Sequence, residues 1–229
     1  MSIRIVIISD THNRHSRVTL PKGDILIHCG DATGVGKISE ITSFRKWFKA
    51  QPFRYKIFTM GNHEVSFEDN FTIAKLMLNL EEGKGEYLLH DESCVVDGIK
   101  IHGNCWQPAF NGWAFGKDSE EELAEKYSTI PSDTDVLVTH SPPYGILDQC
   151  ADGRKVGSFS LLEKIREVKP WLSVFGHIHE GYGTLKLQDL RTTFANAAIC
   201  DLVYHPGNKP IVYDWESKQV VSSEEGLGE

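Results

Sequence analysis

Several features that mark whole classes of protein are missing from this 229-residue sequence. It has five cysteines but no CxxC pair, so we expect reduced, buried thiols in a cytoplasmic protein. The apolar run Ile3–Ile8 is too short for a signal peptide or a membrane span, which argues against a membrane partner. There is no internal repeat, low-complexity segment or convincing linker. We therefore predict one domain over residues 1–229.

Positive charge is also scarce. The chain has 24 Lys and Arg against 32 Asp and Glu, a net charge of −8. Proteins that coat DNA or RNA need a basic face, so long nucleic acid is not an expected partner. A small anionic ligand is compatible with this charge, because bound metal ions can supply local positive charge. The sequence leaves the oligomeric state open.

Short apolar runs and helical patterns follow one another along the chain. We predict strands buried on both faces at Ile3–Ser9, Ile25–Cys29, Tyr55–Met60, Val136–Thr139 and Leu172–Phe175. Helical spacing predicts helices over Ser39–Ala50, Asn70–Leu80, Ser119–Tyr127 and Ser160–Val168. Strand-like stretches without clear helices between them lie at Ser93–Val96, Lys100–Gly103, Thr192–Ala198 and Pro210–Trp215. The pattern indicates an α/β fold of two mixed β-sheets packed as a sandwich flanked by α-helices, with a frayed tail at 221–229.

Metal-type ligands or glycine turns follow five of the predicted strands. Sites in open α/β sheets form beyond the carboxyl ends of the strands, so we expect these groups to meet. If the backbone is extended, both residues of Asp10-x-His12 face one way, as do both residues of His177-x-His179. These ligands are more than one ion needs, and they include carboxylates, so the set suits two ions that share one bridging carboxylate. The candidate ligands are Asp10, His12, Asp31, Asn62, His140, His177 and His179.

Three glycines, Gly30, Gly61 and Gly176, each precede a candidate ligand. A residue without Cβ lets the chain turn sharply, and it lets a phosphate approach the backbone. No cysteine belongs to the ligand set, which disfavours a thiolate zinc site. Imidazole mixed with carboxylate and amide oxygens suits Mn²⁺, Fe or Zn²⁺.

The order of these motifs resembles the calcineurin-like metallophosphoesterase superfamily. Three further segments, Phe110–Trp113, Thr139–Pro143 and His179–Gly183, are similar to the metallophosphoesterase-domain-containing brain proteins and to bacterial relatives that resemble class III cyclic nucleotide phosphodiesterases. The similarity runs from Ile3 to about Trp215. It implies two divalent ions, with Mn²⁺ favoured in assay conditions, and a hydroxide between them that attacks phosphorus.

The resemblance also implies a role for each ligand. One ion would be held by Asp10, His12 and His179, and the other by Asn62, His140 and His177, while Asp31 would bridge both. His63 would be catalytic: it would protonate the leaving oxygen or stabilise charge on the phosphoryl group, as a histidine near neutral pH can. Some members of the subgroup carry Gly at the position of His177 and are implied to be sluggish, so this chain is expected to be a competent catalyst.

An aromatic loop, Trp106–Phe115, surrounds Asn111 and Gly112. It could form a stacking wall for a nucleobase, or a satellite hydrophobic cluster beneath the loop. The candidate substrate-binding residues are Asn111 and Trp113 in this loop and Tyr182 beside the last ligand.

Arginine is missing where protein Ser/Thr phosphatases of the superfamily carry one, shortly after the Gly-Asp motif: Ala32–Gly36 contains none. This speaks against a protein phosphatase and suits a phosphodiester, which carries less charge than a monoester. We predict a phosphodiesterase acting on small phosphodiesters, namely 2′,3′- or 3′,5′-cyclic nucleotides and aryl phosphodiesters. The alternatives are a phosphomonoesterase or 3′-end nuclease, and, in another class, a non-catalytic protein-binding scaffold.

Overall fold

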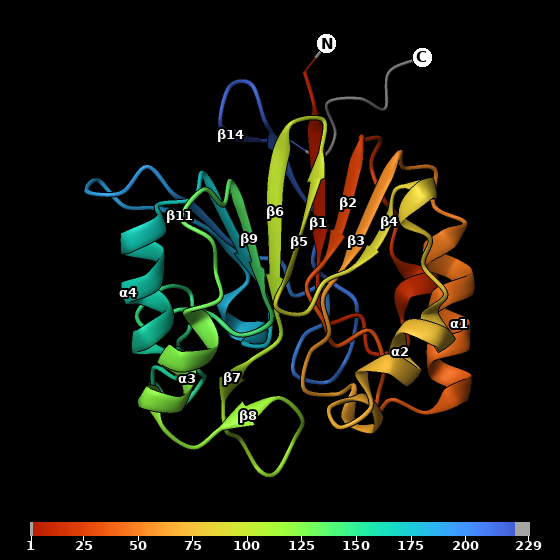
Figure 1. Ribbon diagram of the computed structural model, residues 1–229, viewed down its shortest axis with the longest axis horizontal. Coiled ribbons are helices and arrows are strands. Elements are labelled where there is room, and N and C mark those ends of the chain that lie inside the picture. The colour runs from red at the N-terminus through yellow and green to blue at the C-terminus, as the bar shows by residue number, and fades with distance from the viewer. Residues whose placement is uncertain (1, 223–229) are drawn as a thin grey trace.

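The computed structural model describes residues 2–222, and its two large β-sheets pack against each other in the middle of the molecule (Figure 1). The expected tail begins at Val221, which the structure places at the end of a strand, and residues 223–229 lie outside the described residues. The predicted α/β sandwich of two mixed sheets flanked by helices is confirmed.

The first sheet has six strands in the order β14-β13-β1-β2-β3-β4. Strands β1 to β4 run parallel, whereas β13 pairs antiparallel with both β1 and β14. In chain order the strands are β1 Arg4–Ile8, β2 Ile25–His28, β3 Tyr55–Phe58, β4 Glu86–Leu88, β13 Ile211–Asp214 and β14 Gln219–Val221.

The second sheet has six strands in the order β11-β12-β10-β9-β6-β5. Strands β6, β9, β10 and β12 are parallel, and the edge strands β5 and β11 are antiparallel to their neighbours. Their bounds are β5 Glu92–Val96, β6 Ile99–Asn104, β9 Val136–Thr139, β10 Leu172–Phe175, β11 Gly183–Lys186 and β12 Thr193–Asn196. A small ribbon pairs β7 Gln107–Pro108 with β8 Gly116–Lys117.

Helices cover the outer faces of the sandwich. Figure 1 shows α1 and α2 beside the first sheet and α3 and α4 beside the second. The helices are α1 Ile38–Lys49, α2 Phe71–Leu78, α3 Glu120–Tyr127 and α4 Phe159–Val168, and the short 3₁₀ turns are η1 His15–Arg17, η2 Val65–Phe67, η3 Glu82–Lys84 and η4 His179–Gly181. Over residues 2–222, none of the helices combines the length and apolar composition needed to cross a bilayer.

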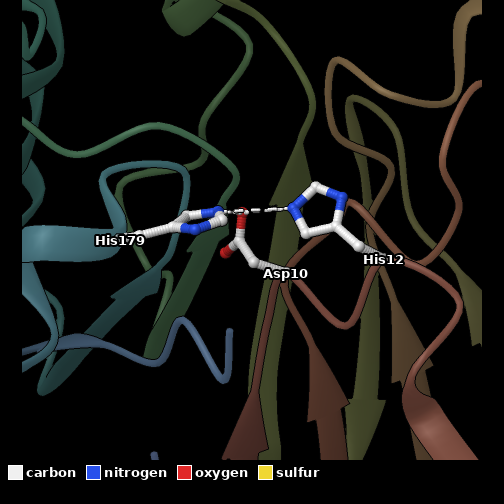
Figure 2. A group of neighbouring side chains, drawn as sticks. All are labelled: Asp10, His12 and His179. Atoms are coloured by element: carbon white, nitrogen blue, oxygen red, sulfur yellow. Dashed lines mark hydrogen bonds and ion pairs between the residues drawn. The ribbon is translucent and has the colours of Figure 1, made fainter. Parts of the chain in front are cut away.

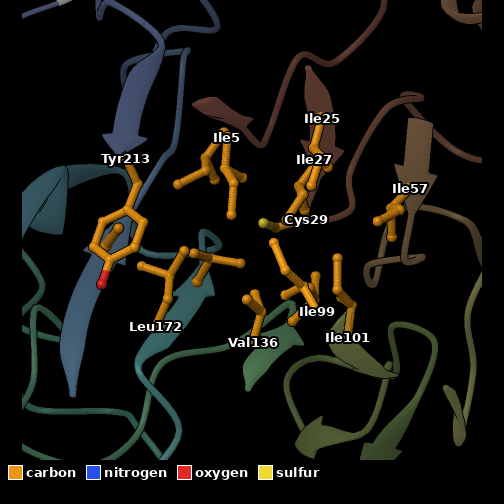
Figure 3. Close-up of a cluster of buried hydrophobic side chains, with 14 of the residues drawn as sticks. Ile5, Ile25, Ile27, Cys29, Ile57, Ile99, Ile101, Val136, Leu172 and Tyr213 are labelled. Carbon is orange, nitrogen blue, oxygen red and sulfur yellow. The ribbon is translucent and has the colours of Figure 1, made fainter. Parts of the chain in front are cut away.

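The main core lies between the two sheets (Figure 3). Alternate residues of one strand point to opposite faces, so Ile5 and Ile7 join this core while Val6 and Ile8 pack under α1 and α2. The buried side chains drawn in Figure 3 include Ile25, Ile27, Ile57, Ile101, Val136 and Leu172. This explains why the central strands read as continuous apolar runs: both of their faces are covered.

Candidate metal centre

The candidate ligands converge where the carboxyl ends of strands from both sheets meet. At this end the two sheets are joined directly: the N–H of Ser9 donates to the Ala197 carbonyl at 2.8 Å, and the N–H of Ile199 donates to the Ser9 carbonyl at 2.9 Å. The ends of β1, β2, β3, β9 and β10 therefore share one edge of the sandwich. Neither sheet alone would bring the ligands together.

The first ligand group is Asp10, His12 and His179 (Figure 2). The Nε2 atoms of the two histidines lie 3.3 Å apart and point toward each other across the carboxylate. Oδ1 of Asp10 lies 3.4 Å from Nε2 of His179 and 3.9 Å from Nε2 of His12. Three donor atoms of these types, so close together, fit a shared cation.

The second group is Asp31, His140 and His177, and Asn62 lies beside it. Oδ1 of Asn62 is 3.0 Å from Nε2 of His140, and that same nitrogen is 3.3 Å from Oδ2 of Asp31. Both His140 and Asn62 are buried. This group combines imidazole, carboxylate and amide oxygen, a donor set that divalent first-row metals accept.

Asp31 lies between the two groups. Its Oδ2 is 3.3 Å from Nε2 of His140 in the second group and 3.9 Å from Nε2 of His12 in the first. Its Oδ1 accepts a hydrogen bond of 2.8 Å from the N–H of His63, which holds the carboxylate in this orientation. The placement suits a bridging ligand.

Backbone carbonyls fix the orientation of several imidazole rings. Nδ1 of His140 donates to the Cys29 carbonyl at 2.8 Å, and Nδ1 of His179 donates to the Asp201 carbonyl at 2.9 Å. Nδ1 of His12 lies 3.3 Å from the Thr33 carbonyl. A carbonyl only accepts, so Nδ1 carries a proton and Nε2 is the nitrogen that faces the centre of the site, as metal-ligating histidines require.

The two carboxylates are held in their ionised form. Burial alone would raise the pKa of Asp10, but the contact with His179 and the nearby histidines hold that pKa well below its usual range. The pKa of Asp31 is lowered in the same way, against burial, chiefly by His140. Two buried negative charges that share one site with neutral or protonated imidazoles make it attractive to cations.

The four histidine ligands divide into two pairs. Burial lowers the pKa of His12 and of His177 to about 4. Burial would also lower the pKa of His140 and of His179, but the carboxylates of Asp31 and Asp10 raise each to about 9. A ligating imidazole must be neutral, so metal binding at pH 7 displaces protons from His140 and His179, and affinity falls as pH falls.

The local backbone differs from the extended segments expected around Asp10-x-His12 and His177-x-His179. Asp10, His12 and His177 have φ of 52°, 38° and 66°, and His179 begins the 3₁₀ turn η4. The paired ligands therefore meet through tight left-handed turns and not through alternation along a strand. Such φ values are costly for residues with a Cβ and persist where the surroundings demand them.

The glycines before the ligands make room for carboxylates. A Cβ at Gly176 would collide with the carboxylate of Asp10 and with Ser9, and a Cβ at Gly61 would collide with the carboxylate of Asp31. At these two positions the structure shows a contact with a ligand carboxylate as the reason for glycine, in place of the expected approach of a phosphate. Here glycine is needed because a ligand side chain lies against the backbone.

Glu64 is a site residue that sequence reasoning assigned no role. It is fully buried, and its carboxylate accepts hydrogen bonds from the N–H groups of Asp31 (3.0 Å), Gly61 (2.8 Å) and Thr33 (3.0 Å) and from the Thr33 hydroxyl (2.9 Å). Burial and the charge of Asp31 raise its pKa to about 7. Glu64 ties together the loops that carry the ligands of β2 and β3. One indication of this role was present in the sequence, namely that Glu64 directly follows Asn62 and His63.

Replacing Glu64 with alanine is expected to destabilise the metal-free protein by about 3 kcal/mol, because three buried N–H groups lose their acceptor at about 1–3 kcal/mol each. Urea unfolding in the presence of a chelator measures this without a contribution from metal binding. Asp69→Ala, which removes an exposed carboxylate nearby, is the matched control and is expected to change stability by less than about 0.5 kcal/mol. Equal effects of the two substitutions would show that Glu64 does not support the site.

His63 stands at the edge of the ligand groups. Its Nδ1 donates to the Gly34 carbonyl at 2.6 Å, its Nε2 lies 3.8 Å from Oδ2 of Asp31, and its ring stacks on Trp113 with centroids 4.2 Å apart. It also forms a third group of close donor atoms with His12 and Asp31, both of which belong to the other groups. The carbonyl and the indole fix the ring so that Nε2 is free to face a bound molecule.

A cleft of about 360 Å³ opens over the ligands. Its floor includes Asp31, Asn62, His63, His177 and His179, and its rim is formed by Phe110, Trp113, Leu202 and Tyr204. Within the described part of the chain, no lysine or arginine lines this cleft. The positive charge needed to hold a phosphoryl group must therefore come from bound metals or protonated histidines.

Part of the aromatic loop packs into a hydrophobic cluster and part of it lines the cleft, so both alternatives predicted from the sequence apply. Trp106 and Phe115 pack into the hydrophobic cluster under the loop, while Phe110 and Trp113 line the cleft. Asn111 is exposed, with φ of 50°, and is not among the residues that line the cleft. The loop thus serves packing at its ends and the cleft in its middle.

Tyr182 and Glu180, which follow His179, turn away from the cleft. The hydroxyl of Tyr182 donates to the Lys209 carbonyl at 2.9 Å, and its ring packs against the core between the sheets. Glu180 accepts from the N–H of Ala151 at 2.7 Å. The structure therefore does not bring Tyr182 to the ligands, and sequence adjacency to His179 was a poor guide because η4 redirects the chain.

Known proteins share both the sequence and the fold. Human metallophosphoesterase domain-containing protein 1 is 40% identical over 231 residues, which cover 92% of this chain and 70% of that protein. UPF0046 protein K07C11.7 of Caenorhabditis elegans is 36% identical over 220 residues, 92% of this chain and 74% of that protein. The crystal structure of TT1561 from Thermus thermophilus superimposes with a TM-score of 0.64 at 10% identity, covering 96% of this chain and 98% of the other.

The family model described as calcineurin-like phosphoesterase matches residues 3–181, a range that contains all the candidate ligands. The human relative is named for the same domain. This chain therefore belongs to the calcineurin-like phosphoesterase family.

Proposed function

We propose that this protein is a metal-dependent phosphodiesterase of small phosphodiesters, including 2′,3′- or 3′,5′-cyclic nucleotides and aryl phosphodiesters. Membership of the metallophosphoesterase superfamily supports phosphoric ester hydrolysis. The observation that carries the diesterase proposal is the cleft: two ligand groups meet at Asp31, His63 faces the same space, and no lysine or arginine of residues 2–222 lines it.

Two divalent ions are part of the proposal, with Mn²⁺ as the metal for assays and Fe or Zn²⁺ as the other candidates. Asp10, His12 and His179 would hold one ion, Asn62, His140 and His177 the other, and Asp31 would contact both. Bound there, the ions would polarise the phosphoryl oxygens and lower the pKa of water to supply a nucleophile.

The protein's own contribution to the chemistry centres on His63. Its Nδ1 proton is committed to the Gly34 carbonyl, so only Nε2 can exchange a proton with a molecule in the cleft. In the protonated ring, Nε2 would donate to the oxygen that leaves phosphorus, and stacking on Trp113 keeps the ring in that plane. Proton transfer from a positioned group lets an alkoxide leave as an alcohol.

The missing cations favour a diester over a monoester. A phosphate monoester at neutral pH carries nearly two negative charges and is usually held by arginine forks, whereas a diester carries one. Trp113, with Phe110 beside it, offers an aromatic surface at the cleft rim on which a nucleobase or aryl group can stack. The proposed partner is thus a small molecule. The proposed setting is cytoplasmic, supported by five cysteines that are all unpaired.

A substrate panel on one metal-analysed preparation tests this proposal. The panel contains 2′,3′- and 3′,5′-cyclic nucleotides, bis(p-nitrophenyl) phosphate, p-nitrophenyl phosphate and a short oligonucleotide, each with added Mn²⁺ and with chelator. We expect metal-dependent turnover of the diesters above that of the monoester. Absence of diester turnover contradicts the proposal, and faster cleavage of the oligonucleotide than of cyclic nucleotides would favour a nuclease.

A further inference from the structure

A short loop after β12 forms the side of the cleft that the aromatic loop does not. We call residues Asp201–Gly207 the rim loop. An isolated antiparallel β-bridge between Cys200 and Pro206 closes the rim loop. Inside it, the carboxylate of Asp201 accepts hydrogen bonds from the N–H groups of Val203 and His205, each at 2.9 Å. The backbone carbonyl of Asp201 accepts from Nδ1 of the ligand His179. One residue therefore shapes the rim loop and anchors it to the metal centre.

The rim loop presents apolar side chains to water beside the cleft. Leu202 is 60% exposed and Tyr204 is 44% exposed, and both line the cleft. Tyr204 has φ of 58°, an uncommon and costly conformation for a bulky residue. Exposed apolar groups in a strained turn gain nothing for folding, and such features concentrate where a ligand is bound.

Tyr204 and the aromatic loop flank the metal centre from two sides. The Tyr204 ring lies 4.5 Å from the ring of His12 and 6.0 Å from that of His179, which belong to the first ligand group. Phe110 lies 6.4 Å from His177 of the second group, and Trp113 stacks on His63. A phosphoryl group over the ligands would thus have one aromatic wall on the His63 side and another over His12.

We propose that Tyr204 and Leu202 form a specificity wall for the ester group that stays on phosphorus, and that the preferred substrates are phosphodiesters in which this group is flat and apolar. The proposal rests on the proposed function. His63 supplies the proton to the leaving oxygen, and its ring lies 4.2 Å from that of Trp113 but 6.3 Å from that of Tyr204, so we place the leaving group on the Trp113 side. The retained group then meets the rim loop, whose side chains that line the described cleft, Leu202 and Tyr204, carry no charge.

A pair of diesters with one leaving group isolates the retained group. Methyl p-nitrophenyl phosphate and phenyl p-nitrophenyl phosphate both release p-nitrophenolate, so the ratio of their kcat/KM values reports on the retained ester, and a change in that ratio between variants reports on contacts of this ester with the protein. We expect the protein to prefer the phenyl diester by about tenfold, the size of one favourable aromatic contact. Tyr204→Ala is expected to remove most of this preference, Leu202→Ala part of it, and Tyr204→Phe little of it. The ratio does not depend on how much of each preparation carries metal.

Val203→Ala is the matched control, because Val203 is 80% exposed in the same loop and does not line the cleft. It is expected to keep the ratio. If Tyr204→Ala hydrolyses both diesters with the original ratio, the wall is excluded while the diesterase stands. If Tyr204→Phe loses the preference as fully as Tyr204→Ala, the hydroxyl and not the ring recognises substrate, and the wall is again excluded. If the unaltered protein with Mn²⁺ cleaves neither diester, the proposed function fails and the wall fails with it.

Discussion

Asp31→Asn is expected to lower kcat/KM for bis(p-nitrophenyl) phosphate by about a thousandfold or more. The carboxylate lies between the two ligand groups, 3.3 Å from His140 and 3.9 Å from His12, so its charge serves both. An amide keeps the shape and can still accept from the N–H of His63, but it cannot neutralise two cations. Metals supply several kcal/mol of stabilisation to such reactions, and about 1.4 kcal/mol corresponds to each factor of ten in rate.

Metal content and rate are measured on the same preparation of Asp31→Asn. We expect the metal stoichiometry to fall together with the rate. Asp133→Asn is the control: this carboxylate is on the surface, paired with Lys100, near the start of β9 and thus at the opposite end of that strand from His140. An Asp31→Asn protein with full rate and full metal content would remove Asp31 as the bridging ligand.

His63→Ala is expected to keep its metal and to lose two to four orders of magnitude in turnover, roughly what a positioned proton donor contributes. The ring is held by the Gly34 carbonyl and Trp113, so its position does not depend on coordinating an ion. His63 also forms a group of close donor atoms with His12 and Asp31, so it could instead be a metal ligand. Metal analysis of His63→Ala decides between the proton donor and the ligand. Loss of one ion from His63→Ala would make it a ligand.

A series of leaving groups tests the proton transfer itself. If His63 protonates the leaving oxygen, diesters with poor leaving groups such as alcohols should lose more rate in His63→Ala than diesters that release p-nitrophenolate, which needs no proton. An equal loss across the series would assign His63 to electrostatic stabilisation of the phosphoryl group. Both outcomes are distinguishable from loss of metal, because metal content is determined in parallel.

Most of the fold could be predicted because its central strands are buried on both faces. The strands Val136–Thr139 and Leu172–Phe175 have the predicted bounds, and the four α-helices differ from prediction by at most two residues at each end. Helix ends moved because capping acts on single residues: Ser158 caps α4 by accepting from the N–H of Leu161, which starts the helix at Phe159.

Less could be predicted about what surrounds the ligands. Glu64 looked like one more polar residue in a turn, yet its carboxylate accepts hydrogen bonds from the N–H groups of Asp31 and Thr33, which lie on the segment after β2. Tyr204 and Leu202 lie in a stretch with no motif, and only the closed rim loop brings them to the cleft. Their importance depends on long-range contacts, which local pattern does not contain.

The sequence by itself determined which side chains can serve as ligands and that they follow the carboxyl ends of buried strands. That placement follows from local apolar patterning and from the rule that parallel strands present their ends at one edge. Only the tertiary structure decided how the ligands meet. The two sheets are joined at Ser9, the turns at Asp10, His12 and His177 are left-handed, and carbonyls from distant segments orient the imidazoles. Ring orientation and backbone strain are set by atoms far away in the chain, so they appear only when the two sheets pack.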